Sequence, residues 1–130
     1  GAIIRTCESK GIKTIIIPKD RSVLVNDTVY KTSEGAIDNV KIVMVTNLIN
    51  TINKLKEMNY FVYCADMDGE DYRKVSYANK KVLVIGNEGL GISSGVKKNS
   101  DVVVGIPMKG KINSLNASVS AGILIYRMDD

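Results

Sequence analysis

The sequence predicts an α/β fold in which a mostly parallel sheet is covered by helices on both of its faces. Five short apolar segments, rich in β-branched residues, lack the alternation of apolar and polar residues that a half-exposed strand shows. Helical patterns lie between several of these segments, and alternating strands and helices are typical of a parallel sheet. The 130 residues suffice for one core, so we expect a single domain over residues 1–130.

Local patterns predict each element in turn. A helical stripe runs through residues 1–10 and stops at Gly11, a residue type that commonly closes helices. Pro18 ends the first strand. Residues 48–58 carry apolar side chains at helical spacing between two strands, so residues 41–65 are interpreted as a β-α-β unit. We expect strands in residues 14–17, 41–46, 60–65, 81–85 and 101–104.

Two later segments differ sharply in polarity. Residues 115–128 carry few charges, which predicts a closing helix that is largely buried. Residues 66–80 form the most polar stretch of the chain, and we expect a mobile surface loop there, beside the functional site.

Composition excludes several classes of protein. Hydrophobic residues make up 45% and charged residues 25%, a globular balance, and no apolar run approaches the ~20 residues that cross a bilayer. We therefore expect a cytoplasmic protein with no membrane partner. Cys7 and Cys64 are the two cysteines and histidine is absent, so we expect reduced core thiols, no bound metal and no histidine general base. The net charge of +4 mildly favours a nucleic-acid partner.

Two polar loops in the last third of the chain are the candidate binding site. Residues 86–91 are glycine-rich and residues 106–120 are rich in small polar side chains, and each loop follows a buried strand. Such loops can converge on one small ligand at the carboxyl edge of a parallel sheet. Neither loop has the spacing of a dinucleotide-binding fingerprint or of a phosphate-binding loop.

The same residues also have simpler structural explanations. The glycines from Gly86 onward could permit a tight strand-to-helix turn. Ser114 and Asn116 could cap the last helix, and Arg5 could be a solvated or paired surface arginine. From these residues taken singly, both explanations remain open.

Taken together, three segments resemble motifs of a known family. Residues 1–6, 84–92 and 106–119 are similar to the three ordered motifs of the SpoU/TrmH-type RNA ribose 2′-O-methyltransferases. Residues 18–22 and 31–36 also resemble the branch that methylates a guanosine ribose in large-subunit ribosomal RNA (23S rRNA). The resemblance extends over essentially the whole chain.

The resemblance implies a fold, a cofactor and a set of site residues. It implies the SPOUT fold, whose C-terminal segment forms a deep trefoil knot, with S-adenosyl-L-methionine bound in the knot of an obligate homodimer. It also implies a cofactor site in which main-chain groups of Gly86, Ile106 and Leu115 bind adenine and ribose. The residues that would line the same pocket are Ala65, Met108 and Ala117.

The positions that match the family's catalytic or substrate-orienting residues are Arg5, Glu88, Ser114 and Asn116. Arginine stays protonated in proteins, so we interpret Arg5 as a clamp on the neighbouring phosphate and a stabiliser of the developing alkoxide. Ser114 and Asn116 would then hold Arg5 or the nucleotide in register, and Glu88 would orient one of them.

The chain departs from the family pattern at its start. The asparagine that usually precedes motif 1 and the usual N-terminal RNA-recognition domain are absent, so we expect an N-terminally truncated catalytic domain. The expected partner is RNA, with ribosomal RNA favoured and transfer RNA as the alternative substrate. Two alternatives from other classes are a nucleotide-cofactor oxidoreductase and a non-catalytic RNA-binding or dimerisation module. Binding of S-adenosylmethionine separates the methyltransferase from both.

Overall fold

The computed structural model describes residues 2–12, 14–19, 40–86, 92–110 and 117–128. Four of the predicted site residues, Glu88, Ser114, Leu115 and Asn116, lie outside these ranges, as does most of the region that resembles the ribosomal RNA branch. The chain divides into two compact units, Gly1–Leu48 and Ile49–Asp130, and each is described by itself.

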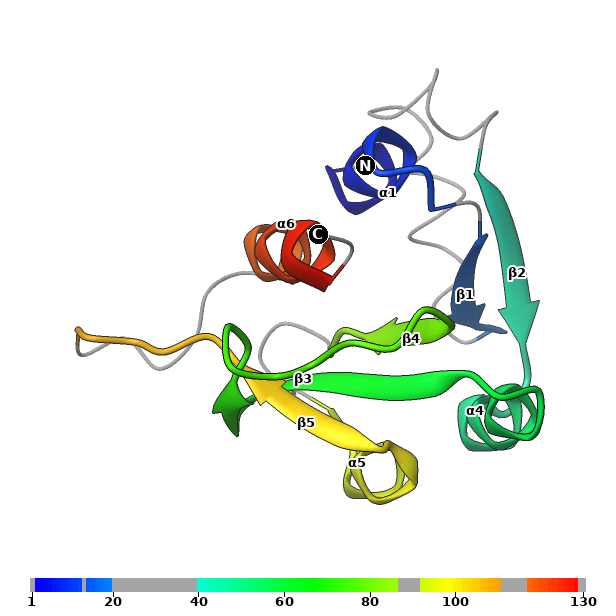
Figure 1. Cartoon of the computed structure of the whole chain (residues 1–130). Coiled ribbons are helices and arrows are strands. Elements are labelled where there is room, and N and C mark those ends of the chain that lie inside the picture. Colours follow the sequence, from blue (N-terminus) through cyan, green and yellow to red (C-terminus); the bar gives the residue numbers. More distant parts are fainter. Residues whose placement is uncertain (1, 13, 20–39, 87–91, 111–116, 129–130) are drawn as a thin grey trace. The chain divides into compact units, whose positions relative to one another are not determined.

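The first unit contains one helix and a two-stranded parallel sheet. Helix α1 spans Ala2–Ser9, and strands β1 (Thr14–Pro18) and β2 (Lys41–Val45) pair from Thr14 opposite Lys41 to Pro18 opposite Val45 (Figure 1). The helix closes as predicted, because Gly11 takes a φ of 76°, a left-handed conformation in which glycine meets no Cβ penalty. Ile4 and Val40 form its small buried core with Ile15 and Ile42.

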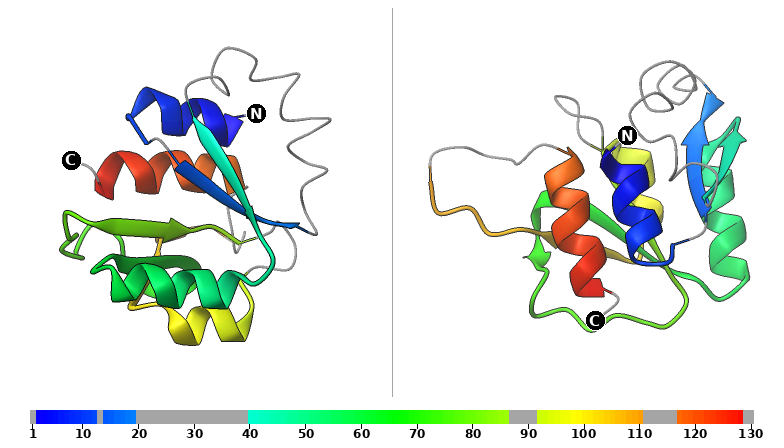
Figure 2. Two further views of the ribbon diagram at one scale, coloured as in Figure 1. Left: turned by 90° about the vertical axis from the view of Figure 1, so that its right-hand side faces the viewer. Right: turned by 90° about the horizontal axis from the view of Figure 1, so that it is seen from above.

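The second unit contains a three-stranded parallel sheet of order β4-β3-β5. Its helices are α4 (Leu48–Glu57), α5 (Ser94–Asn99) and α6 (Ala117–Met128), and its strands are β3 (Phe61–Asp71), β4 (Lys81–Val84) and β5 (Val102–Gly105). Figures 1 and 2 show α6 on one face of this sheet and α4 and α5 on the other. This unit therefore has the helix-covered parallel sheet that the sequence predicts.

The core of the second unit follows the alternation of β3. Tyr63 packs in a buried cluster with Val104 and with Leu124 and Met128 of α6. Val62 and Cys64 flank Tyr63 in sequence, so their side chains point to the opposite face of the strand, and both are fully buried. Both cysteines, Cys7 and Cys64, are buried thiols as predicted, and burial raises the pKa of each.

Two predictions about the elements require correction, and one helix was not predicted. First, the described strands form two parallel sheets, and β2 and β3 of the predicted β-α-β unit do not pair with each other. The sequence locates parallel strands but does not specify their neighbours, because the strands share the same apolar composition. Second, residues 66–71 belong to β3 and are not loop. Residues 66–69 bulge out of the ladder, and pairing with β5 resumes at Glu70 and Asp71, where main-chain hydrogen bonds do not require apolar side chains.

Helix α5 is the element that the sequence does not predict. This helix contributes one buried side chain, Val96, and so carries almost no apolar periodicity. The Ser93 side chain accepts a hydrogen bond from the Val96 amide at 3.3 Å, which stabilises the start of the helix.

Among the described helices none is long and apolar enough to span a bilayer.

Candidate ligand-binding site

A cavity of about 400 Å³ lies in the second unit, where β3 and β5 end. Both strands are parallel, so their carboxyl ends meet at one edge, the usual ligand-binding edge of an α/β sheet. The residues that line the cavity are Met67, Gly69, Asp71, Gly105, Ile106, Pro107, Met108 and Gly110. Its volume is within the range of about 300–1,000 Å³ that is common for small-molecule sites.

A bulge in β3 shapes one wall of this cavity. The register moves from Ala65 opposite Val104 to Glu70 opposite the same Val104, so residues 66–69 bulge out of the ladder. Gly69 approaches β5 so closely that a Cβ would lie 2.5 Å from the Val104 carbonyl carbon. A Cβ on Gly105 would lie 2.8 Å from the Asp66 carbonyl oxygen. Both glycines are therefore needed for this close approach of the two backbones.

One end of the bulge is fastened to α5. The Asp66 carboxylate lies 2.6 Å from the Lys97 ammonium group, and both side chains are partly buried. The hydrogen bond with Lys97 lowers the pKa of Asp66, and the same contact raises the pKa of Lys97. Asp66 therefore stays ionised near neutral pH and holds the bulge to the helix.

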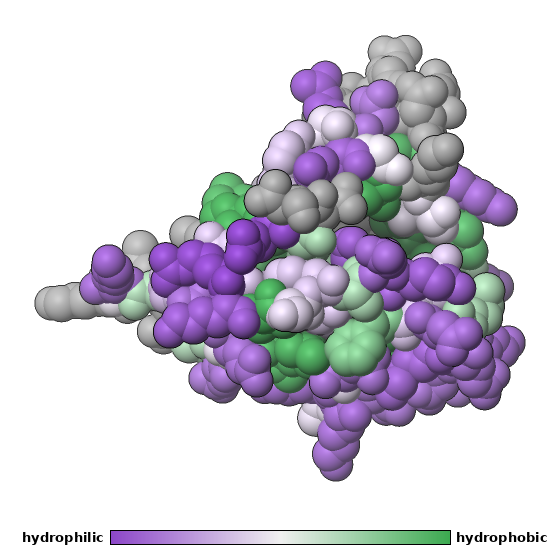
Figure 3. Space-filling view, viewed as in Figure 1, coloured by the Kyte–Doolittle hydropathy of each residue, from purple (hydrophilic) through white to green (hydrophobic). Residues whose placement is uncertain are grey.

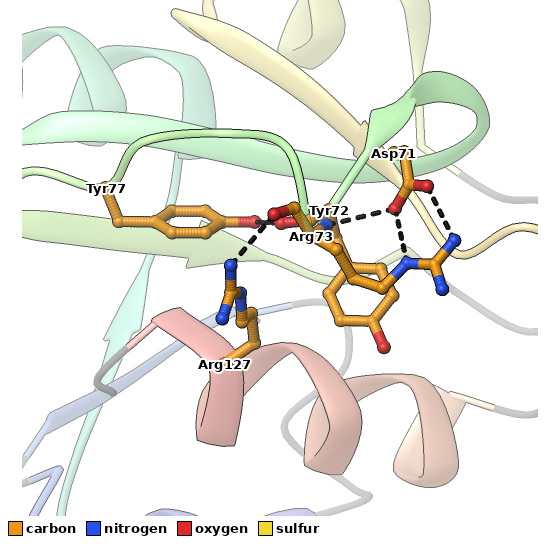
Figure 4. Close-up of polar contacts among 5 residues, drawn as sticks. All are labelled: Asp71, Tyr72, Arg73, Tyr77 and Arg127. Atoms are coloured by element: carbon orange, nitrogen blue, oxygen red, sulfur yellow. Dashed lines mark hydrogen bonds and ion pairs between the residues drawn. The ribbon is translucent and has the colours of Figure 1, made fainter.

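Just beyond the bulge, where β3 pairs with β5 again, lies a second carboxylate that is held differently. Asp71 lines the cavity and accepts hydrogen bonds from Arg73 in the fork geometry of a bidentate pair (Figure 4). The two contacts are 3.0 Å from Nε to Oδ1 and 2.7 Å from Nη2 to Oδ2. The Arg73 side chain and then its backbone N–H lower the pKa of Asp71 to about 2.

The segment that follows Asp71 is fastened to the core and to α6. The Tyr77 hydroxyl donates to the Tyr72 carbonyl at 2.7 Å, and Arg127 of α6 donates to the Arg73 carbonyl at 2.8 Å (Figure 4). The buried Tyr63 hydroxyl accepts from the Ala78 amide at 2.8 Å. Although much of residues 72–80 is exposed, as predicted for a surface loop, these contacts fix its path behind the cavity wall.

The described lysines give only partial support to a nucleic-acid surface. Figure 3 shows hydrophilic residues gathered on the side of the second unit that carries α4 and α5. The last turns of these helices contain Lys54, Lys56, Lys97 and Lys98, where positive charge complements the helix dipole. Lys56 also donates to the Asn99 carbonyl at 3.1 Å. Helix capping and ion pairs therefore explain part of the basic charge.

The structure brings part of the predicted site together. Ile106 and Met108 line the cavity, and the backbone of Gly86 follows β4 at the same carboxyl edge of the sheet. Ala65 instead packs against the buried cluster around Tyr63, and Ala117 begins α6. Arg5 is exposed on α1 in the first unit.

Several cavity residues were not singled out from the sequence. They are Met67, Gly69, Asp71 and Gly105, whereas Pro107 and Gly110 belong to the polar loop that the sequence predicts to be part of the site. A usable signal was present, because Asp68 and Gly69 come shortly after the strand predicted over residues 60–65, where α/β proteins place ligand-binding loops. Because residues 66–80 are so polar, they were predicted to be a loop beside the site and not a wall of the cavity.

Among the described residues, no group of three or more histidine, cysteine, aspartate or glutamate side chains is placed to hold a metal ion.

The fold and cavity define an α/β domain with a cavity of small-ligand size at the carboxyl edge of a parallel sheet, and the wall of this cavity consists mostly of glycine backbone and apolar side chains. The chain belongs to the SpoU rRNA Methylase family, whose model matches residues 1–126. The resemblance of the three motifs to the SpoU/TrmH family is thereby confirmed.

Relatives of known sequence agree with this membership. The chain is 46% identical to an uncharacterized tRNA/rRNA methyltransferase of Borreliella burgdorferi, over 98% of this chain and 57% of that protein. It is 44% identical to an uncharacterized tRNA/rRNA methyltransferase of Mycoplasma genitalium, over 97% of this chain and 53% of that protein. The chain thus spans about half the length of the curated relatives that it matches.

Solved structures agree in fold. A TrmH/SpoU tRNA modifying enzyme of A. aeolicus is 28% identical, with a TM-score of 0.88 over 98% of this chain and 66% of that one. An AdoMet-bound rRNA methyltransferase from Sinorhizobium meliloti is 25% identical, with a TM-score of 0.88 over 98% of this chain and 49% of that one.

Proposed function

We propose that this chain is the catalytic domain of an RNA methyltransferase that uses S-adenosylmethionine to methylate a ribose 2′-hydroxyl. The proposed target is a guanosine of large-subunit ribosomal RNA. The observation that carries the proposal is the cavity at the carboxyl edge of β3 and β5, lined by Ile106 and Met108 of the third family motif. The family resemblance implies that both residues lie at the cofactor site.

The residues of the cavity suit this cofactor. Gly69 and Gly105 line the cavity with main-chain atoms, and Ile106, Pro107 and Met108 offer apolar contact. The main-chain groups of Gly86, Ile106 and Leu115 would hold adenine and ribose, with Ala65 and Ala117 beside them. When bound, the cofactor supplies an electrophilic methyl group on a positively charged sulfur.

The chain's own catalytic task is then mainly positioning. The ribose oxygen must lie in line with the methyl group and must lose its proton as the new carbon–oxygen bond forms and the old carbon–sulfur bond breaks. We assign Arg5 to the adjacent phosphate and to the negative charge that develops on that oxygen. The proton would leave through the phosphate to solvent. Ser114 and Asn116 would keep Arg5 or the nucleotide in register, with Glu88 orienting one of them.

We also propose that the domain works in the cytoplasm as a homodimer whose C-terminal segment forms the knot of the SPOUT fold. Helix α6 supports the dimer, because Arg127 is its single charged residue. Two of its large apolar side chains, Val119 and Tyr126, are 46% and 49% exposed. An apolar helix surface of this kind is suited to a symmetric interface.

Calorimetry with S-adenosylmethionine and with NAD tests the cofactor. Binding of the first and not of the second is expected, and the reverse result would contradict the proposal. The reaction is tested by transfer of a radiolabelled methyl group from S-adenosylmethionine to ribosomal and transfer RNA fragments, using the whole protein.

Ribose methylation protects the adjacent phosphodiester bond from alkaline cleavage, because the 2′-oxygen can no longer attack it. A single protected position in the ribosomal fragment is expected. Protection in the transfer RNA fragment alone would show that transfer RNA, and not ribosomal RNA, is the substrate. Methylation without protection would refute the 2′-hydroxyl as the acceptor.

A further inference from the structure

Asp71 is the one charged residue among the described residues that line the cavity. Its position is set by the backbone, since it lies opposite Gly105 in the β3–β5 ladder and the next amide, of Tyr72, donates to the Gly105 carbonyl at 3.0 Å. Asp71 therefore stays at the wall of the cavity as long as the two strands pair.

The orientation of the carboxylate is fixed as well. Its Oδ1 accepts from the backbone N–H and from Nε of Arg73, each at 3.0 Å, and its Oδ2 accepts from Nη2 at 2.7 Å. An ionised carboxylate has room for about four hydrogen bonds, so Arg73 leaves an acceptor position on Oδ2. The Asp71 side chain is 17% exposed, whereas that of Arg73 is 61% exposed.

Two further contacts hold Arg73 in place, one at its main chain and one at its side chain. Its carbonyl accepts from Arg127, and its guanidinium carbon lies 6.0 Å from the centre of the Tyr72 ring. The carboxylate is thus oriented before any ligand arrives. With a pKa of about 2, Asp71 is fully ionised at neutral pH and can act only as an acceptor.

The remaining described residues of the wall are glycine, methionine, isoleucine and proline, which carry no charge. Arg73 balances the charge of Asp71, but an ionised carboxylate with an acceptor position left over still favours a cationic group, because hydrogen bonds between ions are stronger than neutral ones. We propose that Asp71 is a specificity-determining residue that recognises the positive charge of S-adenosylmethionine. This inference rests on the proposed function, because it takes that cofactor as the ligand.

The positive charge has two possible sources in the cofactor, the sulfonium and the α-ammonium group. Three related ligands separate them. S-adenosylmethionine carries both charges, S-adenosylhomocysteine carries the ammonium alone, and methylthioadenosine keeps the nucleoside but carries neither. Binding of each is measured by calorimetry with the full chain, for the wild type and for Asp71→Asn.

Asp71→Asn preserves size and an oxygen acceptor but removes the charge. We expect it to weaken S-adenosylmethionine about tenfold or more, the usual effect of losing a hydrogen bond to a charged group, and to leave methylthioadenosine within about twofold. Asp68→Asn is the matched control, because Asp68 is exposed in the same bulge, does not line the cavity and makes the same change in net charge. It should change none of the three affinities.

The homocysteine ligand then identifies the group that is recognised. An equal loss of S-adenosylhomocysteine affinity assigns Asp71 to the ammonium, and an unchanged affinity assigns it to the sulfonium. Either result supports the inference.

Two results would overturn the inference while leaving the proposed function intact. One is unchanged binding of S-adenosylmethionine by Asp71→Asn. The other is an equal loss for methylthioadenosine, which would mean that Asp71 binds a neutral group or only shapes the wall. A wild-type chain that binds no S-adenosylmethionine would instead refute the proposed function, and the inference with it.

Discussion

At the scale of single residues, the ion-pair partner of each charged side chain determines how that side chain is held. Asp66 and Asp71 lie five positions apart on β3, and a helix lysine holds one while a neighbouring arginine holds the other. Arg5 is exposed on α1, which agrees both with a surface arginine and with a phosphate clamp. Its function therefore has to be distinguished by experiment.

Arg5→Ala should leave the affinity for S-adenosylmethionine nearly unchanged, because the cofactor site belongs to the later loops. Methyl transfer to the ribosomal RNA fragment should fall on the order of a hundredfold or more, the usual cost of losing one aligned donor. Arg5→Lys should restore little, because lysine lacks the planar fork of arginine. Lys54→Ala removes an exposed positive charge on α4 and serves as the control. Undiminished transfer by Arg5→Ala would leave Arg5 as a surface residue.

The carboxyl group of Asp71 should titrate near pH 2, well below its ordinary value of 3.8. A lowered pKa means that its interaction with Arg73 is fully present above about pH 3.8 and is lost as the pH falls through about 2. Carbon NMR of the labelled side chain measures the midpoint directly, provided that the fold persists over this range. In Arg73→Gln the midpoint should rise toward 3.8, whereas a midpoint near 3.8 in the wild type would refute the pairing.

At the scale of elements, the sequence is informative wherever apolar residues repeat. The cores of all five strands and the helices α1, α4 and α6 follow from that repetition. Apolar repetition does not reveal α5, whose single buried residue is Val96. It also does not reveal the end of β3, where main-chain pairing resumes at the polar residues Glu70 and Asp71. Ile106 and Met108 were predicted to lie at the site from the family resemblance, whereas Gly69 and Asp71 lie in a stretch that was predicted only to border the site.

Gly69→Ala should destabilise the second unit, because the new Cβ would meet backbone atoms of β5 that cannot rotate away. We expect a loss of about 2 kcal/mol in the free energy of unfolding, comparable to overpacking in a core. Gly110→Ala is the control, since Gly110 also lines the cavity but no described atom lies within 4 Å of its Cβ position. Urea unfolding measures both, and equal stability of the two variants would contradict the close approach of β3 and β5.

At the scale of the whole molecule, the sequence predicts the class of the fold better than its connections. Parallel strands resemble one another in composition, so nothing in Lys41–Val45 or Phe61–Asp71 shows that they lie in different sheets. A knot is rarer still, and no local pattern encodes one. The expectation of a knot therefore comes from the family resemblance and not from the residues of this chain alone.

The dimer prediction belongs to this scale. Sedimentation equilibrium over rising protein concentration should give a mass of two chains. Tyr126→Lys, which places a charge on the exposed surface of α6, should shift the equilibrium toward the monomer without lowering the unfolding temperature of the monomer. Met58→Lys is the control, because Met58 is also a large apolar side chain, is 56% exposed and lies outside α6. A wild-type chain that remains monomeric would refute the prediction.

The bulge of β3 also connects two helices that do not follow each other in the chain. Asp66 at its start is tied to Lys97 of α5, and Asp71, two residues beyond its end, is tied through Arg73 to Arg127 of α6. These helices cover opposite faces of one sheet. A ligand that restrains this short run of backbone should therefore slow amide hydrogen exchange in both α5 and α6, including positions that the ligand does not touch.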